Sequence, residues 1–464
     1  MKNTVKGKYK VRCTVSSSST KSVSIPVVNE HAAGIDIGSR SHFVAVGQAL
    51  DDVREFGVYD SDLRECATWL SSHGIKTVAM ESTGSYWQNL YDVLIESGFD
   101  VLLVNGSKTK NIGGKTDVKD CRWIQFLHSV GLLTGSFLPD IDTEELRTLF
   151  RHRDFLLKQG AKYINKMQKS LRMMNFRLDI VLSDITGLSG QTVIKAIISG
   201  ETDPQILASK ADWRVKKSKD EIAKALSYNG RKDYMYELSD SFDLYQSYVQ
   251  KIDACDREIE KLMRSQIIKL GKPQTKPPLL EKKKKQNKNS PKIPLEELSW
   301  QRNDEVNLMS IKGVSHTTVL TVNSEVGLSI SKFSSAKKWV SWLRLSPDNR
   351  ISGGKILSSH VRKGSNRVAA VLRHAAESVG KQKDAPLYPF FQRILQKKGR
   401  CAAIIATARK LAVIIWNMLY YKDIYKPYDT TKIQSQMREK QIKKINKLMQ
   451  VFDVKASEIK FAVA

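Results

Sequence analysis

Residues 32–38 read AAGIDIG, a short apolar run interrupted by a single acid, Asp36. An apolar run of this length before a Ser-Arg-Ser turn predicts a buried strand, and residues 43–46 predict a second strand beyond the turn. A carboxylate inside a buried strand is costly unless a positive charge holds it. We therefore expect either Arg40 or a metal ion beside Asp36, and a domain built around a charged site.

Strands and helices alternate through the residues that follow. The pattern predicts further strands at 56–59, 75–81 and 101–104, with helices at 61–72 and 86–97. Hairpin strands that give way to alternating helices and strands indicate a mixed α/β domain. The strand at 75–81 ends on a second acid, Glu81, directly before a Ser-Thr-Gly turn.

A pair of acids, Asp117 and Asp120, stands in KTDVKD at residues 115–120, at the head of a predicted helix. Residues three apart lie on one helix face. Helix N-termini favour acids, so a solvated helix end alone would explain this pair. Combined with Asp36 and Glu81, however, the pair makes four carboxylates that repel one another unless divalent cations lie between them.

Carboxylate oxygens suit Mg²⁺ or Mn²⁺. Two such ions about 4 Å apart would stabilise both the attacking and the leaving oxygen in phosphodiester chemistry. The four acids in this order along the chain therefore predict a metal-dependent site for DNA or RNA chemistry. A ribonuclease-H-like core is the natural host for such a site.

The whole chain is strongly basic. Its 464 residues hold 76 Lys and Arg against 48 Asp and Glu, a net charge of +28, which favours a polyanionic partner such as nucleic acid. We expect no membrane span, since no apolar run reaches that length and no apolar signal core is visible near the N-terminus. Five scattered cysteines without metal-finger spacing are typical of reduced thiols, and we expect a soluble, intracellular protein.

Residues 140–265 are predicted to be helical. Phe150, Leu157 and later apolar residues repeat at sevens, which predicts coiled-coil seams and a helical arm that dimerises. Cations of nearly uniform sign along the first helix favour contact with a nucleic-acid backbone, although a solvated face is the alternative. These cations are Arg147, Arg151, Arg153, Lys158, Lys162, Lys166, Lys169 and Arg172.

Three other segments have biased compositions. Residues 1–30 are predicted to be a flexible basic tail. Residues 266–295 are predicted to be a linker rich in Lys and Pro, which either separates two domains or binds phosphate as a strap. Residues 426–464 are predicted to form a basic amphipathic tail that packs either on a partner subunit or on RNA.

A second compact domain is predicted at residues 296–425. It contains PDNRISGGK at 347–355, in which Ser352 precedes two glycines after a proline turn. Such a serine is an exposed side chain on a pliable backbone. On the sequence alone, a structural loop is the simpler interpretation.

Five stretches together resemble the successive motifs of the Piv/MooV-like DEDD transposases of bacterial insertion sequences. They are GIDIG at 34–38, MESTGSYW at 80–87, KTDVKD at 115–120, GLLTGSFLP at 131–139 and PDNRISGGK at 347–355. The resemblance implies a RuvC-like domain at residues 31–139. It also implies that Asp36, Glu81, Asp117 and Asp120 bind metal and that Ser352 is a nucleophile forming a phosphoserine ester with DNA.

The resemblance further implies donor and target DNA, a structured noncoding bridge RNA as guide, and dimers that pair into tetramers. It places the protein in the bacterial cytoplasm, at the nucleoid. The sequence thus predicts an RNA-guided DNA recombinase, with a RuvC-like structure-selective nuclease or a non-enzymatic RNA-binding scaffold as the alternatives. The expected nucleic-acid contacts are Lys115, Arg147, Arg151, Lys162, Lys166, Lys355, Arg362, Lys363 and Arg367.

Overall fold

The computed structural model describes residues 26–109, 116–272, 274–280, 284–427 and 431–453. The chain forms two compact units, Met1–Leu138 and Pro139–Ala464. The first is a mixed α/β unit and the second is mostly helical, as the sequence predicted. Lys115, one of the expected nucleic-acid contacts, lies outside the described residues.

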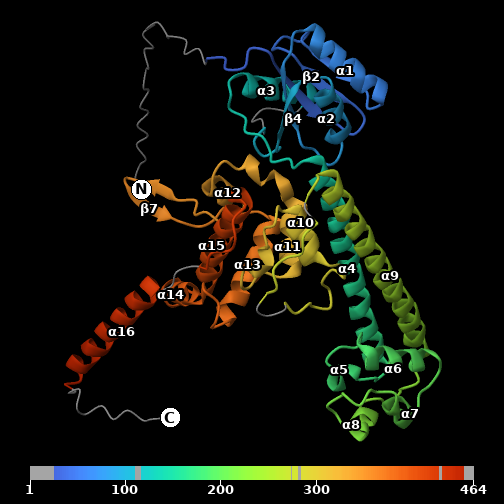
Figure 1. Cartoon of the computed structure of the whole chain (residues 1–464). Helices are drawn as coiled ribbons and strands as arrows, with labels where there is room; N and C mark the ends of the chain where they lie inside the picture. The colour runs from blue at the N-terminus through green and yellow to red at the C-terminus, as the bar shows by residue number, and fades with distance from the viewer. Residues whose placement is uncertain (1–25, 110–115, 273, 281–283, 428–430, 454–464) are drawn as a thin grey trace, which may run out of the picture. The chain divides into compact units, whose positions relative to one another are not determined.

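The first unit carries a five-stranded sheet in the order β3-β2-β1-β4-β5 (Figure 1). β1, β2 and β3 pair antiparallel, whereas β4 pairs parallel to β1 and β5 pairs parallel to β4. The strands are β1 (Ala32–Ile37), β2 (His42–Ala45), β3 (Val53–Phe56), β4 (Thr77–Glu81) and β5 (Asp100–Val104).

The third strand lies earlier than predicted. β3 ends at Phe56, whereas the sequence predicted a strand over residues 56–59. Tyr59 instead precedes helix α1 (Asp60–Ser72), and its backbone N–H donates to the Asp62 carboxylate at 3.2 Å. Because this bond caps the helix, the chain leaves the sheet at Gly57 and the Tyr59 side chain stays 76% exposed.

Helices cover both faces of the sheet. On one face, Ala33, Ile35 and Ile37 of β1 pack in a core with α1 and α2 (Trp87–Glu96). On the other face lies α3 (Asp117–Ser129), whose Gln125 side chain donates to the Ala32 carbonyl at 3.1 Å. Since strand residues alternate between faces, Asp36 lies on the α3 side.

Two long helices, α4 (Ile141–Met173) and α9 (Lys232–Lys269), lie side by side in the second unit (Figure 1). They run antiparallel, because Lys269 binds Asp142 at 3.0 Å near one end and Ser170 binds Glu237 at 3.0 Å near the other. The apolar repeat predicted as a dimerising seam is therefore used within the chain. Among its buried members are Phe150, Leu171 and Ile259.

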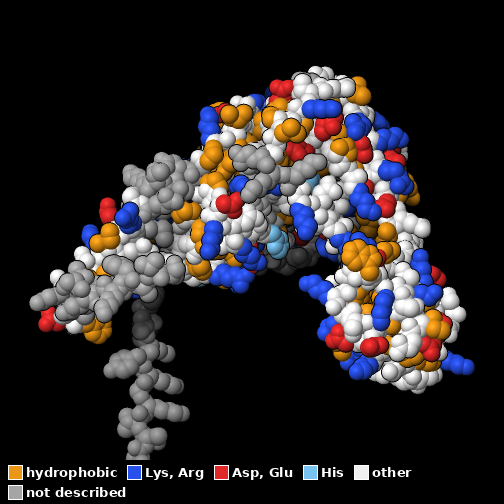
Figure 2. All heavy atoms as spheres, turned by 60° about the horizontal axis from the view of Figure 1, so that its bottom comes forward, with side chains coloured by type: hydrophobic (Ala, Val, Ile, Leu, Met, Phe, Trp, Pro, Cys, Tyr) orange, Lys and Arg blue, Asp and Glu red, His pale blue; other side chains and the backbone are white. Residues whose placement is uncertain are grey.

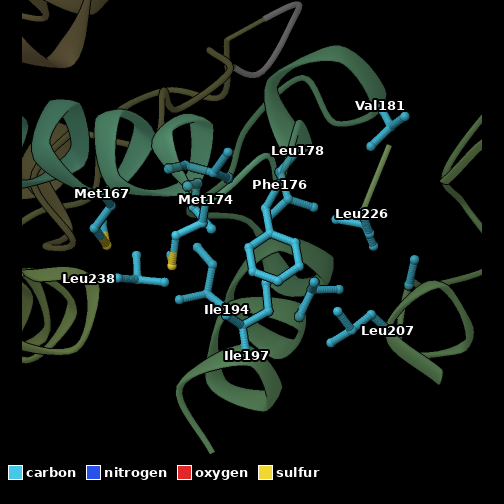
Figure 3. Close-up of a cluster of buried hydrophobic side chains, with 14 of the residues drawn as sticks. Met167, Met174, Phe176, Leu178, Val181, Ile194, Ile197, Leu207, Leu226 and Leu238 are labelled. Atoms are coloured by element: carbon cyan, nitrogen blue, oxygen red, sulfur yellow. The ribbon is translucent and has the colours of Figure 1, made fainter. Parts of the chain in front are cut away.

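Four short helices join the far ends of this pair: α5 (Leu178–Val181), α6 (Leu188–Ile198), α7 (Pro204–Ser209) and α8 (Lys219–Lys224). Figure 2 shows acidic, basic and hydrophobic side chains mixed on this part of the surface. Beneath it, Phe176 lies at the centre of a buried cluster that draws Met167 from α4, Leu238 from α9 and Ile194 from α6 (Figure 3). The end of the arm thus has a hydrophobic core of its own.

The predicted Lys/Pro-rich linker makes specific contacts within the second unit. Lys288 binds Asp184 at 2.6 Å, and Lys292 binds Asp253 at 2.8 Å. Lys284 donates to the carbonyls of Ile311 and Val314 at 2.7 and 2.8 Å. Through these contacts, the three lysines attach the segment to the arm, which consists of α4, α9 and the short helices between them, and to the helical region that follows residue 295.

The C-terminal lobe surrounds one apolar helix, α15 (Arg400–Tyr421). Its other elements are α10 (Leu295–Arg302), η1 (Leu308–Ser310), α11 (His316–Glu325), η2 (Gly327–Lys332), α12 (Ala336–Trp342), the hairpin of β6 (Arg350–Ser352) and β7 (Lys355–Ser358), α13 (Arg367–Lys381), α14 (Tyr388–Lys398) and α16 (Thr431–Val451). The described apolar side chains of α16 are largely exposed, among them Ile445 and Leu448. Only its backbone is described at Ile433 and Met437.

By length and composition, α15 could cross a membrane, whereas the sequence analysis expected no apolar run of that length. Half of its most apolar window is buried inside the protein. The Trp339 indole donates to the Ala412 carbonyl at 3.0 Å, and the Trp416 indole donates to the Phe333 carbonyl at 3.1 Å. These contacts are those of a core helix of the lobe.

Candidate active site

Asp36 and Glu81 come together because β1 and β4 are parallel neighbours. Ile35 of β1 pairs with Met80 of β4, and the next residue on each strand is one of the two acids. The alternation of side chains turns both acids to the face covered by α3, where Thr77 of β4 also contacts His128 at 2.9 Å. Two carboxylates predicted from separate strands thus share one edge of the sheet.

Gly34 allows α3 to approach β1 closely. A Cβ atom at this position would overlap the backbone of Cys121 and Gln125 on α3. The glycine in AAGIDIG therefore leaves room for the α3 backbone two residues before Asp36. Asp117 and Asp120 lie in the first turn of α3, and Thr116 caps that turn by accepting from the Lys119 N–H at 3.4 Å.

The four acids influence one another electrostatically. Burial, together with the negative charges of Glu81, Asp120 and Asp117, raises the pKa of Asp36 to about 6. Arg40, the expected alternative partner of Asp36, is exposed, and the side-chain charges that act on Asp36 are all negative. A carboxylate in such a setting is stabilised in its charged form by a cation.

Glu81 has partners that the sequence analysis missed. Its carboxylate accepts from the Thr109 hydroxyl at 2.5 Å and from the Thr83 hydroxyl at 3.3 Å. A Cβ atom at Gly106 would overlap this carboxylate, so the glycine leaves room for it. Thr109 and Gly106 lie in the segment after β5, the strand beside β4. The sequence could point to this segment only through the expectation that the strand at 101–104 pairs with the strand that ends at Glu81.

The donor set fits a divalent cation, because it consists of hard oxygen ligands whose charges oppose one another. The side chains are not drawn together around a centre: in the described part of the chain, no three Asp, Glu, His or Cys side chains form a group ready to hold a metal ion. The fit therefore rests on the chemistry of the four acids and on the raised pKa of Asp36.

Ser352 lies at the tip of the β6–β7 hairpin in the second unit. Its cross-strand partner is Lys355, and the two residues between them, Gly353 and Gly354, have φ values of +54° and +74°. Glycine adopts such angles without strain, which permits a tight two-residue turn. Ser352 and Lys355 are both exposed, so the hydroxyl and the ammonium face solvent from one edge of the lobe.

Three of the arginines predicted to touch nucleic acid form ion pairs within the second unit. Arg147 is 9% exposed and contacts Glu144 at 2.7 Å and Glu325 at 3.4 Å. Arg151 also binds Glu325, and Arg153 is buried against Asp256. Their charges are compensated by Glu144 on the same helix and by Glu325 and Asp256 from distant parts of the chain. These arginines therefore join helices of the second unit, and only the Arg151 side chain, 46% exposed, also faces solvent.

The remaining predicted contacts are exposed. Lys162 and Lys166 lie on the solvent side of α4, and Lys363 lies beyond the hairpin. Arg362 contacts Asp348 at 3.4 Å, and Arg367 binds Asp154 at 2.9 Å. Among the described residues of the predicted set, Lys162, Lys355 and Lys363 are exposed, and the exposed Lys166 ammonium lies over the Tyr163 ring at 5.7 Å.

Two models of transposase families match this chain. No match was found among curated proteins. A model for the DEDD transposases of the IS110 family, described as a transposase, matches residues 33–176, a range that includes all four acids. A second model, described as the transposase IS116/IS110/IS902 family, matches residues 306–392 and includes Ser352. The chain therefore belongs to the IS110 family of transposases, enzymes that act on DNA.

Proposed function

We propose that this transposase cuts and rejoins DNA strands through a covalent phosphoserine intermediate at Ser352. The observation that carries the proposal is the convergence of negative charge on Asp36, whose pKa is raised by burial and by three further acids. Four acids that repel one another suit metal-assisted phosphoryl chemistry. We take it to belong to a RuvC-like fold, in which parallel strands bring acids to one edge of the sheet.

Asp36, Glu81, Asp117 and Asp120 would hold Mg²⁺ or Mn²⁺. The bound cation would supply positive charge at the reacting phosphate and help to activate a nucleophilic oxygen. Thr109 would keep the Glu81 carboxylate in place through its hydrogen bond. Gly34 would allow α3 to keep its two acids beside β1.

Ser352 would attack a DNA phosphate, so that an Oγ–P bond forms as the P–O bond to a sugar oxygen breaks. The serine proton passes to a base, and the departing sugar oxygen takes up a proton. Because a phosphodiester bond is retained, a hydroxyl of a second strand can displace the serine without an external energy source. Lys355, paired with Ser352 across the hairpin, would neutralise charge on the phosphate.

Guidance by a structured RNA is part of the proposal, and the described surface of α4 supports it. Lys162, Lys166, Lys169 and Arg172 are exposed, and no acid occurs between residues 155 and 178. A row of cations of this kind fits a phosphate backbone. We further propose that the transposase works in the cytoplasm, at the nucleoid, as dimers that pair into tetramers on donor and target DNA.

A strand-exchange assay with donor DNA, target DNA and the RNA encoded beside the gene tests this function. We expect Ser352→Ala, Asp36→Asn and Glu81→Gln each to abolish strand transfer, and Lys338→Ala, which changes an exposed lysine on α12, to keep it. Strand transfer that persists in Ser352→Ala would refute the serine mechanism. Metal-dependent cutting without a protein–DNA adduct would instead indicate a structure-selective nuclease.

A further inference from the structure

The β6–β7 hairpin exposes large apolar side chains next to the proposed nucleophile. Ile351, Ile356 and Leu357 are 63%, 61% and 71% exposed. Isolated exposed apolar residues need no explanation, but Ile351 and Ile356 are cross-strand partners and form an exposed apolar pair, whereas Leu357 follows Ile356 and lies on the opposite face. The segments flanking the hairpin are joined near its base, where Pro347 bridges to Val361 and the Asp348 N–H donates to the His360 carbonyl at 2.8 Å.

The register divides the hairpin into two faces. Ser352 pairs with Lys355, and Ile351 pairs with Ile356. Because neighbouring residues on a strand point to opposite faces, the serine and the lysine occupy one face and the two isoleucines occupy the other. An irregularity between Arg350 and Ile351 shifts the register at the base of the hairpin, where Arg350 pairs with Ser358. The tip of the hairpin thus carries a reactive polar face and an apolar face, one residue apart.

Charge identifies the kind of partner that such a hairpin fits. Residues 349–376 contain no acid and six cations: Arg350, Lys355, Arg362, Lys363, Arg367 and Arg373. Two of the six form ion pairs with acids outside this stretch, Arg362 with Asp348 and Arg367 with Asp154. Apolar side chains set among cations are characteristic of proteins that push a wedge between base pairs while cations contact the flanking phosphates. A two-stranded ribbon also has dimensions that a DNA groove admits.

We propose that the Ile351–Ile356 pair is a wedge that enters duplex DNA and unstacks a base step beside the phosphate attacked by Ser352. This inference rests on the proposed function, because it is the serine that locates the wedge at the cleaved bond. Partial unstacking kinks the backbone, and a kink there would open one side of the phosphorus to the hydroxyl. Duplex DNA would then cover the apolar face that the lobe leaves exposed.

The test uses the full chain with its flanking transcript and a duplex that spans the end of the element. 2-Aminopurine replaces a base next to the cleaved phosphate, since its fluorescence rises when it unstacks. Wild type and Ser352→Ala should give the same several-fold rise. The double variant Ile351→Thr/Ile356→Thr should lose the rise and cut at least 10-fold more slowly, while its DNA affinity, which depends on cations, stays within about 3-fold.

Matched variants distinguish the outcomes. Ile351→Leu/Ile356→Leu keeps the apolar face and should restore the fluorescence rise, and Ile268→Thr, at a residue 68% exposed on α9, should leave it unchanged. A wild-type rise in the threonine double variant would overturn the wedge. So would a change of oligomeric state without DNA, because it would make a second copy of the chain the partner. Cutting by Ser352→Ala with an intact rise would instead refute only the serine mechanism.

Discussion

Arg151 donates two hydrogen bonds to the Glu325 carboxylate, at 3.0 and 2.8 Å, across a sequence separation of 174 residues. Arg147 contacts the same carboxylate at 3.4 Å, and Arg367, the first residue of α13, approaches it at 3.8 Å. Glu325 thereby joins the start of the arm, the end of α11 and the start of α13. The arm and the lobe that carries Ser352 are held together at this residue.

Removing the Glu325 carboxylate should destabilise the second unit. Its side chain is 7% exposed, and that of Arg147 is 11% exposed, so Glu325→Ala leaves a buried guanidinium with less compensation. We expect a loss of about 3 kcal/mol in the free energy of unfolding, measured by urea titration. Arg264→Ala, which breaks an exposed pair with Glu260 on α9, should cost no more than about 0.5 kcal/mol. Equal effects of the two substitutions would contradict this role.

Two glycines should respond in opposite ways to replacement by alanine. Gly34→Ala places a methyl group against the α3 backbone and should cost about 1–3 kcal/mol, with loss of DNA cutting as the acids of α3 shift. Gly160 lies inside α4, where a Cβ would meet Tyr248 at an ordinary 3.6 Å. Gly160→Ala should therefore stabilise the chain by about 0.5–1 kcal/mol. Thermal unfolding checks both, and a harmless Gly34→Ala would refute the close approach of α3.

Asp36→Asn should have opposite effects with and without metal. In EDTA at pH 7.5 it removes one of four mutually repelling charges, so the melting temperature should rise by roughly 2–5 °C, the shift that about 1 kcal/mol produces. Mg²⁺ should raise the melting temperature of the wild type but not that of Asp36→Asn. Asp51→Asn, at an exposed acid of the same unit, serves as the control. Equal stabilisation of all three proteins by Mg²⁺ would argue against these acids as its ligands.

Lys284 should make the stability of the second unit depend on pH. Burial, assisted by the charge of Lys312, lowers the pKa of its ammonium from 10.5 to about 8. Between pH 8 and 10.5 the unfolded chain therefore binds more protons than the folded chain, and stability rises with pH. The stability of the wild type relative to Lys284→Met should increase by about 1–2 kcal/mol from pH 7.5 to 9.5.

Urea titration at each pH measures this difference. Lys276→Met, at an exposed lysine of the same segment, should show no such trend relative to the wild type. If the free energy of unfolding of the wild type relative to Lys284→Met stays constant or falls as the pH rises, the Lys284 ammonium is not buried in solution. The carbonyls of Ile311 and Val314 would then lack this donor.

Local patterns predicted most elements of the first unit, because its strands are short apolar runs and α3 begins at a recognisable threonine cap. Asp36 and Glu81 could be singled out since each acid lies within or at the end of such a run. Their adjacency depends on the parallel register of β1 and β4, which involves residues some 45 positions apart and is invisible to local patterns. Thr109 carries no signal of its own, because only the fold brings it to Glu81.

The arm shows where local patterns mislead. Arg147, Arg151 and Arg153 read as a basic stripe, since two of the acids that pair with them, Glu325 and Asp256, lie more than 100 residues away. The apolar repeat of the same helix predicted a coiled-coil seam of a dimerising arm, and in the structure the apolar face of α4 packs on α9 of the same chain. Charge and periodicity indicate that a helix face makes contacts. They do not indicate whether the partner is another helix of the same chain, a second subunit or nucleic acid.

The central claim is that Ser352 becomes covalently attached to DNA. The most direct test incubates the transposase and its transcript with a nicked duplex that cannot be rejoined, and then analyses the denatured, trypsin-digested protein by mass spectrometry. Trypsin cleavage after Arg350 and Lys355 isolates residues 351–355. We predict that this peptide carries a nucleotide esterified to Ser352 and that Ser352→Ala yields no adduct. Metal-dependent cleavage with an unmodified peptide, undiminished in Ser352→Ala, would contradict the account.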